Sequence, residues 1–227
     1  AILAIMLSIF QLYVSLFSKL GVMQERAIFL GLGLVLTFLI YPTRKGWEGT
    51  KKEWIIKSIF IVGAVTSTIY IVNKFDTIVS SFGFPSVLDL TFGVIAIIVI
   101  FESARRAIGL GLPIIALAGV AYIFLGPYLP ELINHYGITF ERFVSSMYMT
   151  TQGILGSILG VVATYVFMFI LVGAFLNQSG AGKFYIQLSL ALVGKLRGGP
   201  AYVATLASAL MGTVNGSGVA NAASTGV

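Results

Sequence analysis

Near the end of the chain, glycines alternate with residues that carry neutral oxygen atoms. The run from Gly212 to Asn221 reads Gly-Thr-Val-Asn-Gly-Ser-Gly-Val-Ala-Asn, and it follows the apolar stretch Ala201–Met211. Glycines at this density break a helix, and the break exposes carbonyl, Ser and Asn oxygens at one point. Such hard, neutral ligands suit a small alkali cation. We predict Asn215, Ser217 and Asn221 as the ligands, with Gly216 and Gly218 in the same turn and Thr213 and Ser224 behind them.

The same glycines admit a purely structural interpretation. Gly212 and Gly216 are four residues apart, as are Gly156 and Gly160, and small residues at this spacing let membrane helices approach closely. For Gly156 and Gly160 we favour close packing. For the run from Asn215 to Asn221 we favour binding, because polar groups are costly in a membrane unless something uses them.

A short helix must carry this run of residues into the membrane. It should begin at Pro200, because proline suits a first helical position, where its missing N–H is not needed. After about a dozen residues, or about 18 Å, the helix meets Gly212 near the middle of a bilayer. Discontinuous helices at that depth form ion and substrate sites in many secondary transporters.

The composition places the whole chain in a membrane. Hydrophobic residues make up 58% of the chain and charged ones 10%, whereas a soluble domain has about 25% charged residues. The sequence therefore predicts an all-α, polytopic integral membrane protein with about six transmembrane helices plus the start of a re-entrant helical hairpin in Pro200–Val227. The expected spans are Ala1–Leu20, Ala27–Tyr41 (extending back toward Val22), Trp54–Val72, Val87–Phe101, Ala107–Leu125 and Gly153–Leu176.

The distribution of cations sets the predicted orientation. With the first span running outward, ten Lys and Arg residues fall inside and four outside, as positive-inside insertion requires. The inner ones are Arg44, Lys45, Lys51, Lys52, Lys57, Arg105, Arg106, Lys183, Lys195 and Arg197; the outer ones are Lys19, Arg26, Lys74 and Arg142. The net charge of +6 is therefore a topology signal, and we predict no nucleic-acid partner.

Enzymatic function is disfavoured by what the chain contains. There is no cysteine, and the one histidine, His135, falls in an outer loop, whereas Ser217 is expected near mid-depth. A nucleophile needs a base within hydrogen-bond reach, so this pair is implausible. We predict no catalytic residue and no cofactor, with Na⁺ as a coupling ion only.

Other polar residues have ordinary structural roles. We predict that Glu102, Arg105 and Arg106 form a topology-setting cluster with local ion pairing rather than a proton relay, and that Asp89 caps a helix. His135 and Glu131 should form a surface pair.

Two connecting stretches have some structure of their own. The outer stretch Gly126–Met147 could form a short surface helix that touches an external partner, or serve as a connector. The inner stretch Lys183–Leu196 is expected to form a helix in the membrane interface.

Several stretches resemble a known family. Gly194–Pro200, Gly212–Asn221 and Gly173–Phe184 resemble the large membrane subunit of tripartite ATP-independent periplasmic (TRAP) transporters. Four earlier stretches resemble the fused type, in which a small four-helix subunit precedes the large one: Phe10–Tyr13, Phe38–Pro42, Glu102–Arg106 and Gly153–Gly156.

The resemblance implies a function and a division of the chain. It implies sodium-coupled import of organic acids, such as carboxylates, which a periplasmic binding protein of the TAXI class delivers, in the cytoplasmic membrane of a bacterium or archaeon. Residues 1–106 would form a small-subunit-like scaffold and residues 107–227 the start of the transport part. Gly212–Asn221 would be the tip of a re-entrant hairpin that contributes to a sodium site, and the chain would be an N-terminal fragment. Two alternatives stay open, a proton-coupled transporter and a non-transporting assembly or anchoring subunit.

Overall fold

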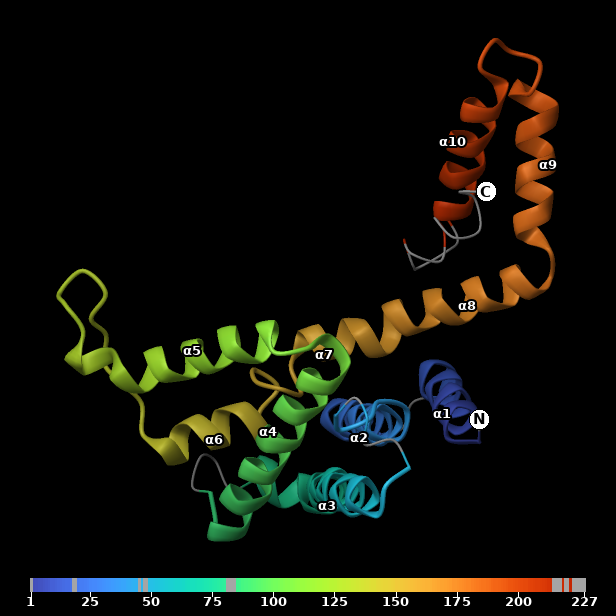
Figure 1. The fold of residues 1–227 in the computed structure, drawn as a ribbon. Coiled ribbons are helices and arrows are strands. Elements are labelled where there is room, and N and C mark those ends of the chain that lie inside the picture. Colours follow the sequence, from blue (N-terminus) through green and yellow to red (C-terminus); the bar gives the residue numbers. More distant parts are fainter. Residues whose placement is uncertain are drawn as a thin grey trace. The chain divides into compact units, whose positions relative to one another are not determined.

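The computed structural model describes residues 2–17, 20–44, 46, 49–80, 85–213, 218 and 221. These residues form helices and connecting turns, with no β-strand among them. They divide into two compact units, Ala1–Gly160 and Val161–Val227. The elements, labelled in Figure 1, are α1 (Ile2–Phe17), α2 (Val22–Ile40), α3 (Lys51–Ser80), α4 (Val87–Ile108), α5 (Gly111–Leu125), the 3₁₀ turn η1 (Gly126–Tyr128), α6 (Phe140–Tyr148), α7 (Ser157–Val161), the π-helical η2 (Val162–Val166), α8 (Phe167–Gln178), α9 (Ala181–Val193) and α10 (Gly199–Gly212).

The predicted membrane character is confirmed. Five helical stretches in the described part are long and apolar enough to cross a bilayer: Val22–Ile40, Lys51–Phe75, Val87–Ile108, Gly111–Tyr128 and Ser157–Leu176. The first apolar helix, α1, has 16 residues and is shorter. Large apolar side chains such as Ile59 and Ile115 lie exposed on the helix surfaces, as expected where lipid covers them.

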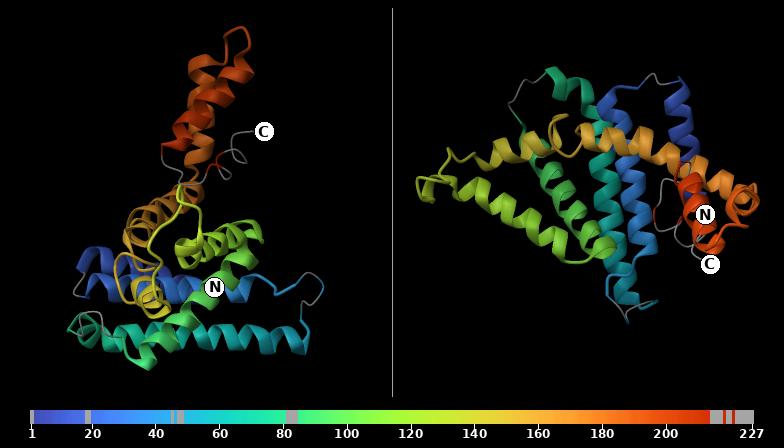
Figure 2. Two further views of the ribbon diagram at one scale, coloured as in Figure 1. Left: turned by 90° about the vertical axis from the view of Figure 1, so that its left-hand side faces the viewer. Right: turned by 90° about the horizontal axis from the view of Figure 1, so that it is seen from above.

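In the first unit, α2, α3 and α4 form the core. Figure 2 shows α2 and α3 side by side along their length, and α4 packs on both. One buried cluster contains Phe38 of α2, Ala64 of α3 and Val99 of α4. Small residues set the spacing, because a Cβ on Gly31 would lie 2.2 Å from the Thr68 hydroxyl oxygen. These helices are held by close van der Waals packing, the main attraction between helices in lipid.

The start of α4 confirms the predicted role of Asp89. The Asp89 carboxylate accepts a hydrogen bond from the Ser86 backbone N–H at 2.7 Å, and the Ser86 hydroxyl oxygen accepts from the Asp89 N–H at 3.3 Å. These two reciprocal hydrogen bonds satisfy two backbone N–H groups that have no partner within the first turn of the helix. The Tyr70 hydroxyl donates to the same carboxylate at 2.5 Å, which ties α3 to α4.

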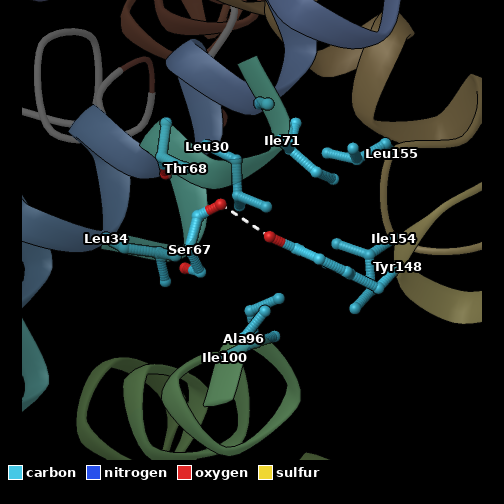
Figure 3. A pocket seen from close by; sticks show the side chains of 11 residues that line it. Leu30, Leu34, Ser67, Thr68, Ile71, Ala96, Ile100, Tyr148, Ile154 and Leu155 are labelled. Atoms are coloured by element: carbon cyan, nitrogen blue, oxygen red, sulfur yellow. Dashed lines mark hydrogen bonds between the residues drawn. The ribbon is translucent and has the colours of Figure 1, made fainter. Parts of the chain in front are cut away.

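Helix α6 turns back into the bundle and does not form a free surface helix. It packs on α4 with Val144 and Tyr148 buried, and the Tyr148 hydroxyl donates to the Ser67 carbonyl at 2.6 Å. Figure 3 shows this bond beside a cavity of about 20 Å³. The first turn of α6, Phe140 to Arg142, is exposed. The predicted contact of this stretch with an external partner stays a prediction.

The sixth span begins later than expected. We predicted a helix from Gly153, but residues 151–155 form a turn and α7 starts at Ser157. The Ile154 N–H donates to the Met147 carbonyl at 2.8 Å, and a Cβ on Gly153 would lie 2.4 Å from the Met147 Cα. The glycine therefore allows a tight turn at a place where the apolar composition alone favoured helix.

Gly160 packs against a side chain from a distant part of the chain. We predicted that Gly156 and Gly160 let two helices pack closely. Gly160 of α7 does lie against α2, since a Cβ there would lie 2.6 Å from a terminal nitrogen of Arg26, whereas Gly156 lies in the turn before α7. The Arg26 guanidinium donates to the Leu155 carbonyl at 2.9 Å. An arginine at the start of α2 thus holds the turn before α7 in place.

Candidate functional site

The turn before α10 explains the glycines of the Gly194–Pro200 stretch. Gly198 has a φ of +83°, a left-handed conformation that disfavours other residues. A Cβ on Gly199 would lie 2.3 Å from the Gly194 carbonyl oxygen, so the two ends of the turn approach too closely for a side chain. Pro200 then stands in the first turn of α10, as predicted. The motif thus encodes a sharp reversal between two helices.

Helices α9 and α10 pack side by side as a hairpin (Figure 1). Ser189 of α9 is fully buried, as are Ala207 and Met211 of α10. A Cβ on Gly182 would lie 3.4 Å from the Met211 methyl carbon. The helix predicted within Lys183–Leu196 is confirmed as α9, and its position in the membrane interface stays a prediction. The sequence analysis did not identify its packing on α10.

The chain turns back at the end of α10. The helix ends at Gly212, as the glycine pattern predicted, and the Thr213 hydroxyl donates to the Leu210 carbonyl at 2.6 Å. Eight residues farther on, the Asn221 amide nitrogen donates to the Ser208 carbonyl at 3.1 Å and to the Ser208 hydroxyl at 3.2 Å. Asn221 therefore lies beside the last turn of α10.

The end of α10 is suited to a cation. The last carbonyl groups of a helix have no partner within the helix, and together with the helix dipole they give its C-terminus a partial negative charge. Between Gly198 and Val227 the sequence has no charged residue. The groups that could bind a cation in this segment are therefore neutral oxygens, which suit a monovalent ion.

The predicted ligands are described only in part. Asn215, Gly216, Ser217 and Ser224 lie outside the described residues. Of the others, Thr213 and Asn221 both lie at the end of α10, and Gly218 is exposed with open space around it.

Ser208 makes a contact at the end of α10 that was not predicted from the sequence. It binds the Asn221 side chain through both its carbonyl and its hydroxyl. Ser208 and Gly212 are small residues four apart, and this spacing places them as a stripe along one side of α10. That stripe could have identified the face against which the returning chain packs.

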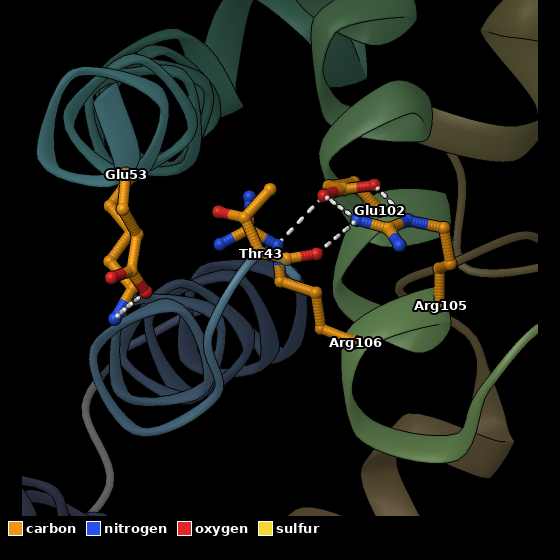
Figure 4. Close-up of polar contacts among 6 residues, drawn as sticks. Thr43, Glu53, Glu102, Arg105 and Arg106 are labelled. Carbon is orange, nitrogen blue, oxygen red and sulfur yellow. Dashed lines mark hydrogen bonds and ion pairs between the residues drawn. The ribbon is translucent and has the colours of Figure 1, made fainter. Parts of the chain in front are cut away.

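The charged cluster at the C-terminal end of α4 forms local ion pairs, as predicted (Figure 4). Arg105 binds both oxygens of Glu102, from Nε at 2.7 Å and from Nη2 at 2.7 Å. Arg106 donates from Nε to Oε1 of the same carboxylate at 2.7 Å. One turn into α3, Lys57 lies 3.0 Å from Glu53. Paired in this way, Glu102 is a poor member of a proton relay.

His135 does not pair with Glu131. Its ring nitrogens lie 3.2 Å from the Tyr136 carbonyl oxygen and 3.1 Å from that of Tyr122. Within the described part of the chain, Glu131 has no ion-pair partner. The predicted surface pair is wrong, because the imidazole instead holds the backbone of the loop after α5.

Comparison with known families identifies the chain. The model of the tripartite ATP-independent periplasmic transporter DctM component matches residues 95–227, which is more than half of the chain. The chain belongs to the DctM family. No curated protein and no solved structure matches it.

Membership of the DctM family fixes the broad function. The chain is a multi-pass membrane protein and a permease component of a TRAP transporter, a family of transporters rather than enzymes. DctM components work with a periplasmic binding protein and in a lipid bilayer. The match begins within α4 and includes the hairpin α9–α10 and its tip.

Proposed function

We propose that the chain is the permease component of a sodium-coupled secondary transporter that imports small organic acids. The observation that carries this proposal is the reversal at the end of α10, where Asn221 returns to Ser208. This contact places the Asn221 side chain beside the carbonyl end of a helix, where the helix dipole favours a cation. Sodium bound there would order the solute site, and movement of the hairpin-bearing part would give alternating access.

The remaining proposals follow from the resemblance. The solute is a carboxylate delivered by a periplasmic binding protein of the TAXI class, and the chain sits in the cytoplasmic membrane of a bacterium or archaeon. Residues 1–106 form a small-subunit-like scaffold, and residues 107–227 begin the transport part.

A proton-coupled transporter is the second candidate. Proton coupling needs a titratable group at the site, and the segment from Gly199 to Val227 has no Asp, Glu or His. All eight acidic residues of the sequence precede Gly160, so none belongs to the unit that carries the α9–α10 hairpin. Sodium is therefore the better-supported coupling ion.

Transport in proteoliposomes tests the proposal. The full-length protein and its binding protein are supplied with a panel of labelled carboxylates under an imposed gradient of Na⁺, K⁺ or pH. We expect uptake of one or a few carboxylates with the Na⁺ gradient alone. The double variant Ser217→Ala, Asn221→Ala should lower uptake strongly, whereas Thr205→Ala should not, because the Thr205 hydroxyl bonds the Ala201 carbonyl of its own helix.

The other outcomes identify the alternatives. Uptake driven by a pH gradient without sodium would establish proton coupling. Absence of uptake under every gradient, with protein that stays folded, would favour the assembly or anchoring subunit.

A further inference from the structure

The cluster at the cytoplasmic end of α4 has one positive charge in excess. A single carboxylate, that of Glu102, is shared by the guanidinium groups of Arg105 and Arg106. Arg105 also donates from Nη2 to the Thr43 carbonyl at 3.2 Å. One negative charge therefore faces two positive charges, and no second carboxylate pairs with either arginine among the described residues.

The Arg106 guanidinium is buried without enough partners. Its side chain has no exposed surface, and its guanidinium carbon lies 4.9 Å from the ring centre of Phe38 and 5.3 Å from that of Phe60. Within the described part of the chain, its two terminal nitrogens, Nη1 and Nη2, have no hydrogen-bond partner. Aromatic faces offset part of this cost, but an unpaired buried charge remains expensive and attracts a counter-ion strongly in a low dielectric.

A groove opens beside this cluster, between α4 and α5. Its volume is about 430 Å³, and apolar side chains such as Ile98, Phe101, Ile114 and Leu117 line it. The charged residues that line it are Glu102 and Arg105. Arg105 is about one-third exposed, and its Nη1 has no partner among the described residues. The groove is thus apolar along its length with a cationic end.

The length of the groove matches one leaflet of a bilayer. Along α5 it extends from Leu110 to Val120, a rise of about 15 Å at 1.5 Å per residue. The hydrocarbon of one leaflet is about 15 Å deep, half of a core about 30 Å thick. The charge distribution places the Arg105 end at the cytoplasmic surface, where a lipid phosphate lies.

We propose that this groove binds an anionic phospholipid of the cytoplasmic leaflet. An acyl chain lies along α4 and α5, and the phosphate accepts hydrogen bonds from the free Nη1 edge of Arg105. The excess charge of Arg106, behind Arg105, selects an anionic over a zwitterionic headgroup. A free phosphate ion would leave the apolar groove unfilled, so the groove favours the lipid as the source of the anion.

Lipid binding to the full-length protein in detergent tests this proposal. The probes are phosphatidylglycerol and phosphatidylcholine with the same acyl chains, titrated by native mass spectrometry. We expect phosphatidylglycerol to bind about fivefold more tightly, since the one net positive charge of the cluster contributes roughly a fivefold preference. Equal affinities of the wild-type protein for the two lipids would overturn the proposal.

Variants separate the headgroup contact from the groove. Arg105→Gln should reduce the preference for phosphatidylglycerol to about twofold or less, whereas Lys52→Gln, at an exposed cation on the same side, should leave it unchanged. Arg105→Lys keeps the charge and should retain part of the preference, so it serves if Arg105→Gln fails to fold. A full preference in Arg105→Gln would contradict the assignment.

A variant with a larger side chain inside the groove tests the acyl-chain contact independently. Leu117→Trp should weaken the binding of both lipids by about the same factor, because it occupies the groove and leaves the arginines intact. Glycerol phosphate, which has the phosphate without chains, should not displace the lipid. Lipid binding that is unaffected by Leu117→Trp, or displaced by glycerol phosphate, would show a headgroup site without the groove.

Discussion

The two units of this protein use polar groups in different ways. In Ala1–Gly160, polar side chains join segments that are far apart in sequence: Tyr148 donates to the Ser67 carbonyl and Arg26 to the Leu155 carbonyl. In the α9–α10 hairpin, the helices meet through small residues such as Ser189 and Ala207, and the returning chain contacts α10 through Asn221. Polar side chains thus join distant segments in the first unit, whereas in the hairpin the polar contact of the returning chain lies at the end of α10.

Among the variants that test this difference, Tyr148→Ala should have the largest effect on stability. It removes a buried ring and its hydrogen bond, and we expect the free energy of unfolding to fall by about 3–5 kcal/mol. Tyr148→Phe removes only the hydroxyl and should cost about 1 kcal/mol. Unfolding in mixed micelles measures both. Tyr136→Ala, at a fully exposed tyrosine, is the control and should change stability by less than about 0.5 kcal/mol. A similar effect of Tyr148→Ala and Tyr136→Ala would show that Tyr148 does not fasten α6 to the bundle.

A double-mutant cycle tests the contact between Arg26 and the turn before α7. Arg26→Gln should cost about 1.5–3 kcal/mol, because it removes a charged donor from the Leu155 carbonyl. Gly160→Ala should displace the same guanidinium, since its Cβ would lie 2.6 Å from it. The double variant should therefore lose less free energy of unfolding than the two single variants together, measured in the same unfolding assay. Strict additivity would mean that the two residues act separately.

In the hairpin, Gly198→Ala should have a smaller effect. The left-handed φ of +83° costs a residue with a Cβ about 1–2 kcal/mol. Hydrogen exchange of the α9 and α10 amides measures the loss. Gly119→Ala, at a helical glycine with nothing within 4 Å, should be neutral or slightly stabilising. Equal results for the two variants would contradict the turn geometry.

The smallest effect is expected for Ser208→Ala. It removes one of the two acceptors of the Asn221 amide, so about 0.5–1 kcal/mol of local protection should be lost near the tip. The same exchange experiment detects it at the last turn of α10. Loss of protection throughout Ala1–Gly160 would count against a local role.

Much of the helical pattern could be predicted, because it follows from local chemistry. Pro200 and Gly212 bound α10, and Asp89 caps α4, as expected from residue type alone. The turn at Gly153 could not be predicted, since it depends on a close approach to Met147 that composition does not encode. The pairing of α9 with α10 was missed for a similar reason, because apolar composition suits an interfacial helix and a packed one equally well.

At the candidate site, the end of α10 could be predicted, but the contacts made there could not. The glycines indicated where α10 ends, and the asparagines indicated neutral ligands. Ser208 was not identified, because a serine within a helix usually bonds its own backbone. The excess charge on Arg106 was also not evident, because it depends on one carboxylate serving two guanidinium groups.

The sodium site at the tip is tested most directly by thermal unfolding of the full-length protein in sodium against equal potassium. A ligand that binds only the folded state stabilises it by roughly 2.7 kcal/mol at one hundred times its dissociation constant. We predict a sodium-specific rise in Tm that Ser217→Ala with Asn221→Ala abolishes and Thr205→Ala preserves. The same Tm in both salts, or a sodium-specific rise that survives the double variant, would contradict a sodium site at the end of α10.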